Sequence, residues 1–599
     1  MSVAAILDKT AGDSSTRSTR FHRWTPRGVL ALTMLATGAA GLIYEYVLST
    51  VLSYLIGNSI EQFSITIGVM FAMMGVGGFL QKFWRTALPE VFVAAELALV
   101  VLGGFAPIIL QWAFVQLPED FGWIKFIYTC LLGFLVGLEI PLIMRINEQF
   151  TSSLGSNIAG TWAWDYVGGA VGVILWIILL RLFVPMTYIS FVVAYFNLLV
   201  AILSLVFFWK RGMLKSRTTK LGVMAATAFV SFGMIAGATH VDAWGSKLTQ
   251  QLYEDPVNTV INTKYQNIVL TQGPHPTDPS SHNYVLWLNG NKQFSSLDEK
   301  IYHEYLVHPS MNLAAQHKRV LILGGGDGLA LREVLKYPGV ESVTLVDLDP
   351  EMVNLARTHP VLRALNQDAF SDARVATNLD DPALNKGITD TGRKRKVVVQ
   401  SNDEKVDCKE QDQQGECTVT PITKEVAEVN VFNIDADLFL SRARGQWDVV
   451  IVDLPDPNSV ELAKLYSKEF YSKVKRILNP DGIAVVQATS PYHAKETFLC
   501  ILRTMAAAGL GVVPYHDNVP SFGDWGWIMA SPTLASKNIA DRAVALTEFP
   551  VSTVEVGAAN MQRALVFNLG WLTSSSSEIS TVMRPVVFDY YVYEGWKVE

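Results

Sequence analysis

The sequence predicts a multi-pass α-helical membrane domain, followed by a small antiparallel β domain and an α/β Rossmann-like domain. Half of its 599 residues are hydrophobic and only 17% are charged, a balance that is unusual for a wholly soluble protein. Long apolar stretches fill the chain up to residue 240, whereas short β-type runs and helical patterns alternate beyond it. A chain of this length is expected to hold more than one folding unit.

Charge and cysteine usage exclude several kinds of partner. The chain carries 48 Lys and Arg against 55 Asp and Glu, a net charge of −7. That balance offers no basic surface for nucleic acid. The 4 cysteines are too few for a disulfide scaffold and form no CxxC or Cys/His cluster. We therefore expect no nucleic-acid partner and no metal site.

A basic cytoplasmic tail at residues 1–27 precedes a run of apolar stretches, each long enough for the roughly 20 residues that a bilayer crossing takes. We predict about seven spans, which form one transmembrane domain over 28–240 in contact with the lipid bilayer. The first stretch is too long for a cleavable signal peptide and lacks an A-x-A-like break. The stretches lie at 28–56, 63–81, 91–111, 124–144, 158–180, 187–209 and 221–240.

Lys and Arg are distributed unevenly between the loops. They gather in the tail and in alternate loops, most densely at 210–220, whereas the remaining loops carry only Lys125 and Arg181. The positive-inside rule then predicts that the N-terminus lies in the cytoplasm. An odd number of spans would put the chain after residue 240 outside the cytoplasm.

Four acids lie within the predicted spans: Glu45, Glu96, Glu139 and Asp165. Ionisable groups inside a bilayer often mark a polar pathway, but they also occur as paired groups or near helix ends. The sequence leaves both explanations open and identifies no transported solute.

The pattern changes after residue 240. YQNIVL and YVLWLNGNKQF are typical of strands separated by turns, which predicts a small β domain plus a helix over 241–315. KRVLILGGGDGLALREVL then has the strand, glycine turn and helix of a nucleoside-binding βαβ unit, in which Gly324 and Gly326 let the backbone approach a ligand. We assign 316–533 to this Rossmann-like domain and 534–599 to a C-terminal extension.

Carboxylates follow successive strands of the Rossmann-like domain. Asp347 lies about 20 residues after the glycine turn, where an acid can accept both hydroxyls of a ribose. Asp435, Asp453 and Asp456 follow two later strands, so we expect all four at one sheet edge, although one of them could merely cap a helix. Asp327, inside the glycine turn, would repel a pyrophosphate, so a cationic ligand fits better than NAD.

Between residues 262 and 533 the chain resembles the spermidine synthase (polyamine aminopropyltransferase) family. Together with its helical region, it is similar to the membrane-fused bacterial members. The pieces that carry the resemblance are YQNIVL, LNGNKQF, DEKIYHEYLVH, VLILGGGDGLALREVLKYPGVESVTLVDLDP, WDVVIVDLPDP and LYSKEFY, in this order. The resemblance implies a small β domain and a methyltransferase-type Rossmann-like domain. It also implies transfer of an aminopropyl group from the co-substrate decarboxylated S-adenosylmethionine to an amine such as putrescine, with methylthioadenosine as by-product and no prosthetic group.

The resemblance also implies roles for the residues that match the family's motifs. Asp453 would be the general base, with Tyr302 beside it at the reacting amine. The donor would be bound by Gln266, Gly324, Gly326, Asp347, Asp435 and Ala436. The amine and the aminopropyl group would be bound by His303, Asp327, Asp453, Asp456 and Phe522.

The chemistry agrees with these residue types. A primary amine is protonated at neutral pH, so a carboxylate must accept its proton as it attacks the carbon next to the sulfonium. Asp327 would also oppose the carboxylate of ordinary S-adenosylmethionine, which disfavours methyl transfer. Two departures from the family pattern fall on the acceptor side. Pro457 is not followed by the usual Gly-Pro step, and Phe522 stands in place of a tyrosine.

A function of another class stays open, namely a polyamine or nucleoside transporter or sensor with little catalysis. The intramembrane acids would suit it, but the joint presence of Tyr302, Asp453 and Asp456 favours the enzyme. The donor is a cytoplasmic metabolite, which conflicts with the topology read from the loops, so the side of the catalytic domain also stays open. Soluble relatives commonly pair through their β domains, which makes a homodimer an option.

A polar insertion interrupts the Rossmann-like domain at 381–428. Its segments KVVVQ and ECTVTPI predict a hairpin that would bring Cys408 and Cys417 together, and a disulfide there would favour a location outside the cytoplasm. We expect the insertion to be a surface excursion without a catalytic role.

Overall fold

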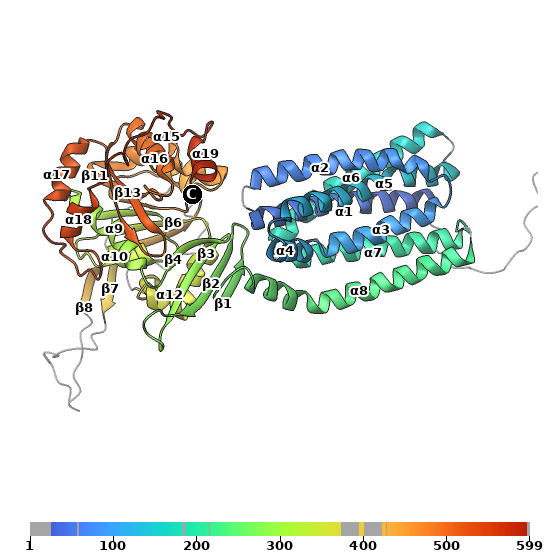
Figure 1. Ribbon diagram of the computed structural model, residues 1–599, viewed down its shortest axis with the longest axis horizontal. Helices are drawn as coiled ribbons and strands as arrows, with labels where there is room; N and C mark the ends of the chain where they lie inside the picture. The colour runs from blue at the N-terminus through green and yellow to red at the C-terminus, as the bar shows by residue number, and fades with distance from the viewer. Residues whose placement is uncertain are drawn as a thin grey trace, which may run out of the picture. The chain divides into compact units, whose positions relative to one another are not determined.

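The computed structural model describes residues 26–56, 59–151, 153–181, 186–214, 216–372, 395–399, 422–426 and 428–595. The chain forms two compact units (Figure 1). One is helical and consists of residues before Ala243. The other holds the sheets, from Ala243 onward, together with the helical segments Ser49–Ile65 and Gln111–Pro118.

The helical unit is built from long apolar helices. Six helices in the described ranges are long and apolar enough to cross a membrane, or up to seven if α3 and α4, which are bent by 54° at their junction, count as one span. Pro107 explains this bend, because it lacks an N–H and its ring clashes with the carbonyl of the preceding turn. The helices are α1 (Pro26–Ile56), α2 (Ser59–Leu80), α3 (Leu88–Gly104), α4 (Ala106–Gln116), α5 (Phe121–Asn147), α6 (Leu154–Arg181), α7 (Met186–Lys210) and α8 (Arg217–Gln250).

The last helix is longer than its apolar stretch. The predicted boundary at residue 240 falls inside α8, which continues to Gln250, and the first strand starts only at Val257. The polar residues after 240 mark the end of the apolar segment but not of the helix, because none of them is a proline before Pro256.

Side-chain hydrogen bonds identify the helix ends that lie together at one end of the bundle. Arg27 Nε, at the start of α1, donates to the Phe150 carbonyl oxygen at 2.6 Å, just beyond α5. Arg145 Nη1, at the end of α5, donates to the carbonyl oxygen of Gln81 just after α2, at 3.1 Å. The start of α1 and the ends of α2 and α5 therefore share one end.

The other end of the bundle is defined by α4 and α8. Gln111 Nε2 donates to Thr249 Oγ1 at 3.2 Å, and Gln116 Nε2 donates to Gln251 Oε1 at 3.0 Å. Gln116 lies just before α5, whose 27 residues separate it from the Arg145 end by about 40 Å at 1.5 Å per residue. The bent α3–α4 pair thus carries the chain from one end of the bundle to the other.

The small β domain is a four-stranded antiparallel sheet in the order β1-β2-β3-β4. Asn289 and Gly290 turn the chain between β3 and β4 with φ of 50° and 77°, as a two-residue Asn-Gly hairpin requires. A buried helix, α9 (Glu299–Leu313), follows. The strands are β1 (Val257–Asn262), β2 (Asn267–Pro274), β3 (His282–Leu288) and β4 (Asn291–Ser295).

The large sheet has seven strands in the order β12-β13-β11-β10-β5-β6-β9. β11, β10, β5, β6 and β9 are parallel, and β13 is antiparallel to both of its neighbours, β11 and β12. This arrangement confirms the predicted Rossmann-like fold. The strands are β5 (Arg319–Gly324), β6 (Ser342–Asp347), β9 (Glu428–Asn433), β10 (Trp447–Asp453), β11 (Leu478–Gln487), β12 (Gly511–Val519) and β13 (Gly523–Ser531).

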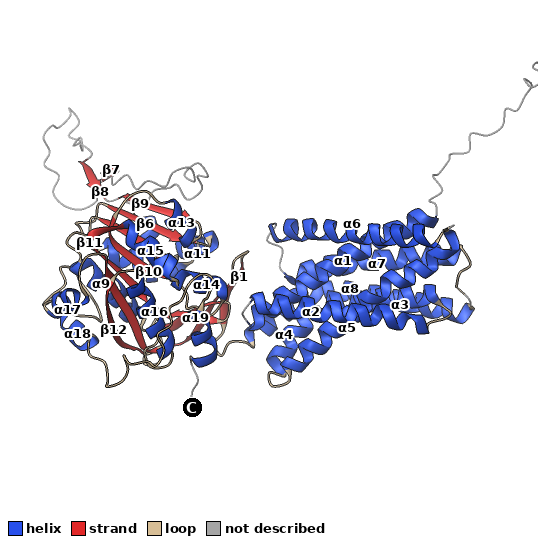
Figure 2. Ribbon diagram, turned by 90° about the horizontal axis from the view of Figure 1, so that it is seen from above, coloured by secondary structure: helices blue, strands red, loops and turns tan. Residues whose placement is uncertain are grey.

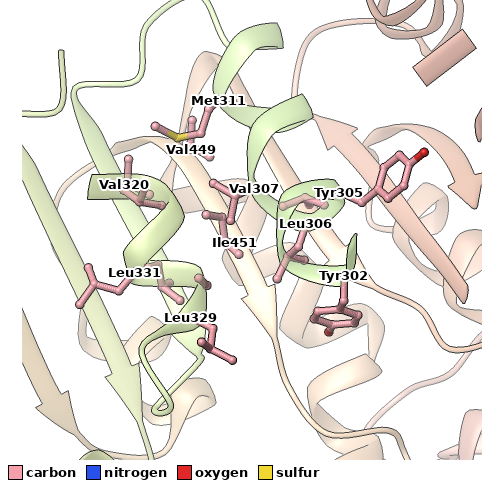
Figure 3. Packing of buried hydrophobic residues seen from close by; sticks show 14 of the residues in the cluster. Tyr302, Tyr305, Leu306, Val307, Met311, Val320, Leu329, Leu331, Val449 and Ile451 are labelled. Carbon is pink, nitrogen blue, oxygen red and sulfur yellow. The ribbon is translucent and has the colours of Figure 1, made fainter. Parts of the chain in front are cut away.

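Helices cover both faces of this sheet (Figure 2). Alternate residues of β10 separate the two cores: Val449 and Ile451 pack with α9 to α12, α17 and α18, whereas Val450 and Val452 pack with α13 to α16 and α19. Figure 3 shows Val307 of α9 close to Ile451 in the first core. The helices are α10 (Leu329–Leu335), α11 (Pro350–Thr358), α12 (Pro360–Leu365), α13 (Ala436–Arg442), α14 (Val460–Ala463), α15 (Lys468–Ile477), α16 (Lys495–Ala507), α17 (Ser536–Val544), α18 (Ala558–Ala564) and α19 (Val586–Asp589).

Only part of the polar insertion belongs to the described residues. Within it, β7 (Arg395–Val399) pairs antiparallel with β8 (Ile422–Val426). Cys408 and Cys417 lie outside the described residues, so their pairing stays a prediction.

Candidate active site

The predicted carboxylates converge at one edge of the large sheet. β10, β5, β6 and β9 are neighbours and parallel, so their carboxyl ends meet at the same edge. Asp453 ends β10, Asp347 ends β6, and Asp435 follows β9 directly before α13. Open α/β sheets bind their ligands in the crevice at this edge.

The glycine turn is fixed by close contacts with these strands. Gly324 has φ of 87°, and a Cβ there would lie 1.9 Å from the Asp453 carbonyl oxygen. A Cβ on Gly326 would lie 2.5 Å from Asp347 Oδ2, which accepts a 2.9 Å hydrogen bond from the Gly326 N–H. The two positions therefore require glycine, because a side chain would collide with the Asp453 backbone at the first and with the Asp347 carboxylate at the second.

Asp347 is held by backbone donors on both of its oxygens. Oδ2 accepts from Gly326 N at 2.9 Å and Oδ1 from Asp349 N at 2.8 Å. Burial raises the pKa of Asp347 to about 7, although these hydrogen bonds oppose the shift. A ligand that brings hydroxyl donors or positive charge would favour the ionised form of this buried carboxylate.

Asp453 and Tyr302 form a hydrogen-bonded pair. The Tyr302 hydroxyl donates to Asp453 Oδ1 at 2.8 Å, from α9 to the end of β10. Burial raises the pKa of Asp453 to about 6, while the positive charge of His303 and the tyrosine hydrogen bond oppose the shift and Asp327 adds to it. A carboxyl poised near neutrality suits proton transfer.

His303 is the cation of the site. Its Nδ1 lies 2.7 Å from the Glu299 carbonyl oxygen and 3.1 Å from Glu299 Oε2, one helical turn earlier. Burial lowers the pKa of His303, but Glu299 and the charges of Asp327 and Asp453 outweigh it and raise the pKa to about 9. Arg332 donates to the same carboxylate with Nη1 and Nη2 at 2.8 and 2.9 Å, which fixes the orientation of the group that pairs with His303.

Asp456 lies on the loop after β10. Gln487 Nε2 donates to its Oδ1 at 3.1 Å, and the hydroxyl of Tyr591 donates to its Oδ2 at 2.9 Å. Burial raises the pKa of Asp456 to about 6, and both hydrogen bonds oppose the shift.

Two other predicted acids have structural partners. Asp327 accepts from the Leu329 N–H at 2.9 Å, and burial raises its pKa against the opposing charge of His303. Asp435 caps α13 by accepting from Leu438 N at 2.9 Å and pairs with Lys464 Nζ at 2.7 Å. Despite burial, these contacts lower the pKa of Asp435. Of the four acids at this edge, Asp435 is therefore the one that caps a helix.

The remaining predicted residues adjoin the groups already described. Gln266 of the β domain donates to Asp349 Oδ2 at 3.0 Å, two residues beyond Asp347, and Ala436 is buried at the start of α13. Phe522 packs on Trp525 with ring centroids 4.8 Å apart and on Tyr302 at 6.3 Å. The structure therefore brings the predicted donor and acceptor residues to the same sheet edge.

Comparisons with known proteins agree with this geometry. The family described as Spermine/spermidine synthase domain matches residues 299–407 and 417–541. Polyamine aminopropyltransferase 1 of Streptomyces coelicolor is 35% identical over 588 residues, which cover 98% of this chain and 96% of that protein. The chain belongs to the polyamine aminopropyltransferase family. Polyamine aminopropyltransferases of Leptospira interrogans and Oceanobacillus iheyensis are 34% and 33% identical, over 84% and 90% of this chain and 87% and 90% of theirs.

This aminopropyltransferase has site residues that the sequence patterns did not reveal. Glu299 and Arg332 fix His303, whereas Gln487 and Tyr591 hold Asp456. Glu299 could have been found, because it precedes His303 by four residues and helical residues at that spacing face each other. No local pattern links Tyr591 to Asp456, since 135 residues separate them.

One cluster of the aminopropyltransferase has the composition of a metal site. Ligand atoms of Glu304, His308 and Glu333 lie within 4.8 Å of one another. Glu304 accepts three backbone N–H groups of 554–556 at 2.7, 2.9 and 2.8 Å, and Glu333 pairs with Arg332 at 2.7 Å. His308 bonds Glu333 at 2.9 Å. The cluster therefore has a structural role: through Glu304 it links α9 to the C-terminal extension.

Proposed function

We propose that this aminopropyltransferase moves the aminopropyl group of decarboxylated S-adenosylmethionine to a primary amine such as putrescine and releases methylthioadenosine. The observation that carries the proposal is the Tyr302–Asp453 pair beside charged His303, at the edge where Asp347 is also held. The pair supplies a proton acceptor, and Asp347 supplies a ribose acceptor.

Asp453 acts as the general base. The amine enters as an ammonium, gives one proton to Asp453 and attacks the carbon next to the sulfonium with its lone pair. The carbon–sulfur bond breaks, and its electron pair stays on sulfur, which becomes the neutral thioether of methylthioadenosine. The positive charge thereby passes from sulfur to the new secondary ammonium. The hydrogen bond from Tyr302 keeps the Asp453 oxygen oriented for this proton transfer.

The charge of the site favours two cationic substrates together. Asp327, Asp453 and Asp456 carry the negative charge of the site, and the two cations near them, His303 and Arg332, are both paired with Glu299. The excess negative charge offsets the sulfonium and the ammonium. The same excess repels the carboxylate of ordinary S-adenosylmethionine, which supports the decarboxylated donor and speaks against methyl transfer.

Product release by purified full-length protein tests this function. Methylthioadenosine is measured with decarboxylated S-adenosylmethionine and a panel of amines, with Asp453→Asn as the control. We expect release that depends on an amine and falls about 10³-fold in the variant, within the range of general-base effects. Donor binding without release by the wild-type protein would overturn the proposal in favour of a sensor or transporter.

We further propose that the protein is a multi-pass protein of the bacterial inner membrane, with its N-terminus in the cytoplasm and its catalytic domain on the other side. The support is the helical region itself, which has up to seven helices long and apolar enough to cross a membrane in the described ranges if the bent α3–α4 pair counts as one span. Arg27 and Arg145 share one end of the helices, and the end of α7 with Lys210 and Arg211 lies there too, because Phe207 packs on Phe150. The positive-inside rule expects such basic residues on the cytoplasmic side.

Cysteine labelling in spheroplasts tests this topology. A variant with Cys130→Ser and Cys500→Ala retains Cys408 and Cys417, and a membrane-impermeant maleimide is added after mild reduction. We expect labelling without permeabilisation. Labelling only after permeabilisation would place the catalytic domain in the cytoplasm and would require an even number of spans.

A further inference from the structure

The acceptor carboxylate Asp456 is held from two distant parts of the chain. Gln487 of β11 donates to Oδ1 at 3.1 Å, and its amide is itself fixed by the Leu454 carbonyl oxygen and the Tyr466 hydroxyl, both at 2.6 Å. The second oxygen, Oδ2, accepts the Tyr591 hydroxyl at 2.9 Å. The orientation of Asp456 therefore depends on the C-terminal extension as well as on the sheet.

The segment that carries Tyr591 is anchored in the core. Val586, Val587 and Phe588 of α19 are buried among the helices of the second face of the sheet. Before them, Ser580 bridges α15 and α16, because its carbonyl oxygen accepts from Lys468 N and its N–H donates to Thr504 Oγ1, both at 2.9 Å. These contacts fix the extension as a part of the catalytic domain.

Tyr591 itself lies in a single π-helical turn, Tyr590–Glu594, a geometry that recurs at functional sites. The turn ends at Gly595, where a Cβ would lie 2.7 Å from the Tyr591 carbonyl oxygen and 3.4 Å from Ala494 Cβ. Tyr591 is only half-buried, and its hydroxyl bonds the carboxylate of Asp456.

Phe522 lies between β12 and β13 and, unlike Tyr591, has no hydroxyl. Its ring packs on Trp525 at 4.8 Å between centroids and adds an apolar surface beside Tyr302. We propose that Tyr591 is a positioning residue for the acceptor amine, which orients the Asp456 carboxylate from the C-terminal extension. This inference rests on the proposed function, because it takes Asp456 as a partner of the amine.

The test compares full-length Tyr591→Phe with a matched control. Tyr593→Phe makes the same chemical change in the same turn, where the side chain is 55% exposed. Binding of putrescine to protein saturated with methylthioadenosine is measured by calorimetry. We expect Tyr591→Phe to weaken it by roughly tenfold or more, as the loss of a hydrogen bond to a charged group does, and Tyr593→Phe to leave it within twofold.

Kinetics separate positioning from a general structural role. Tyr591→Phe should raise KM for the amine by a similar factor, leave KM for the donor unchanged, and move the acidic limb of the pH profile to higher pH. The shift follows because the hydrogen bond from Tyr591 lowers the pKa of Asp456 in the wild-type protein, so its removal raises that pKa. Unchanged amine binding, or an equal fall in donor and amine affinity with a lower melting temperature, would overturn the inference. If the wild-type protein binds putrescine without transferring an aminopropyl group, the binding comparison still decides the inference while the proposed function fails.

Discussion

The hydroxyl of Tyr302 donates a 2.8 Å hydrogen bond to Oδ1 of Asp453, and this contact joins α9 to the end of β10. It stabilises the ionised carboxylate, whereas burial favours the protonated one and raises the pKa of Asp453 to about 6. Above that pH the pair presents a proton acceptor of fixed direction to the crevice.

Removal of the Tyr302 hydroxyl should slow catalysis at neutral pH. Because the hydrogen bond from Tyr302 lowers the pKa of Asp453, Tyr302→Phe raises that pKa and moves the acidic limb of kcat to higher pH. We expect a loss of about tenfold at pH 7 that is partly recovered at pH 8.5, since a hydrogen bond to a charged group is worth about 1.5–3 kcal/mol. Steady-state kinetics across pH measure it. A uniform loss at every pH would show that the hydroxyl does not act through Asp453.

Donor binding should release protons near neutrality. The pKa of Asp347 is about 7 in the free protein because of burial, against 3.8 for an ordinary Asp. Ribose hydroxyls and a nearby sulfonium favour the ionised form, so a bound donor lowers this pKa and expels the proton. Calorimetry in two buffers of different ionisation enthalpy should show release at pH 6.5 and much less at pH 8.5. Proton uptake at pH 6.5, or release that persists in Asp347→Asn, would contradict the assignment.

The fold could be predicted because it depends on local patterns. Asp347 and Asp453 reach the same edge since the carboxyl ends of parallel strands meet, and this follows from the strand order alone. The polar residues after 240 led to a predicted boundary ten residues before the end of α8, because polarity marks the end of an apolar surface and not of a helix. The apolar pattern predicted one continuous span at 91–111, although Pro107 within it indicates a bend.

The supporting contacts of the site could not be predicted in this way. Arg332 binds Glu299 across 33 residues, and Gln266 binds Asp349 across 83. Such pairs depend on how α10 packs on α9 and how the β domain packs on the sheet, which neither hydrophobic period nor motif specifies. Residues that orient the reactive groups are therefore the part of a site for which three-dimensional packing is needed.

Loss of the Arg332 cation should be strongly destabilising. Glu299 and Glu333, both 1% exposed, pair with it at 2.8 and 2.7 Å. Arg332→Met removes the cation that these two buried carboxylates share, although Glu299 keeps its pair with His303 and Glu333 its pair with Lys336. Removing one partner of a buried ion pair costs about 3–5 kcal/mol. Lys318→Met is the control. The Lys318 side chain is 52% exposed, so its 3.3 Å ion pair with Glu341 contributes at most about 1 kcal/mol. Thermal unfolding in detergent compares the variants, and equal melting temperatures would contradict the network's structural role.

Asp349 should affect the donor and not the amine. It accepts from Thr263 Oγ1 at 2.8 Å, from Gln266 Nε2 at 3.0 Å and from Glu351 N at 3.1 Å, so it links the β domain to the start of α11. Asp349→Ala removes a helix cap worth about 1 kcal/mol and leaves Gln266 free to turn away from the donor side. We expect a lower melting temperature and a KM for the donor raised several-fold, with KM for the amine unchanged.

A matched control for this prediction is Ser459→Ala, which removes the cap that accepts from Leu462 N at 3.2 Å without touching the β domain. That variant should lose a similar amount of stability while its donor KM stays at the wild-type value. Because both variants lose a cap, the difference between them isolates the contact with Gln266. If both change the donor KM alike, the effect comes from loosened helix ends, and the link between Asp349 and the donor side is wrong.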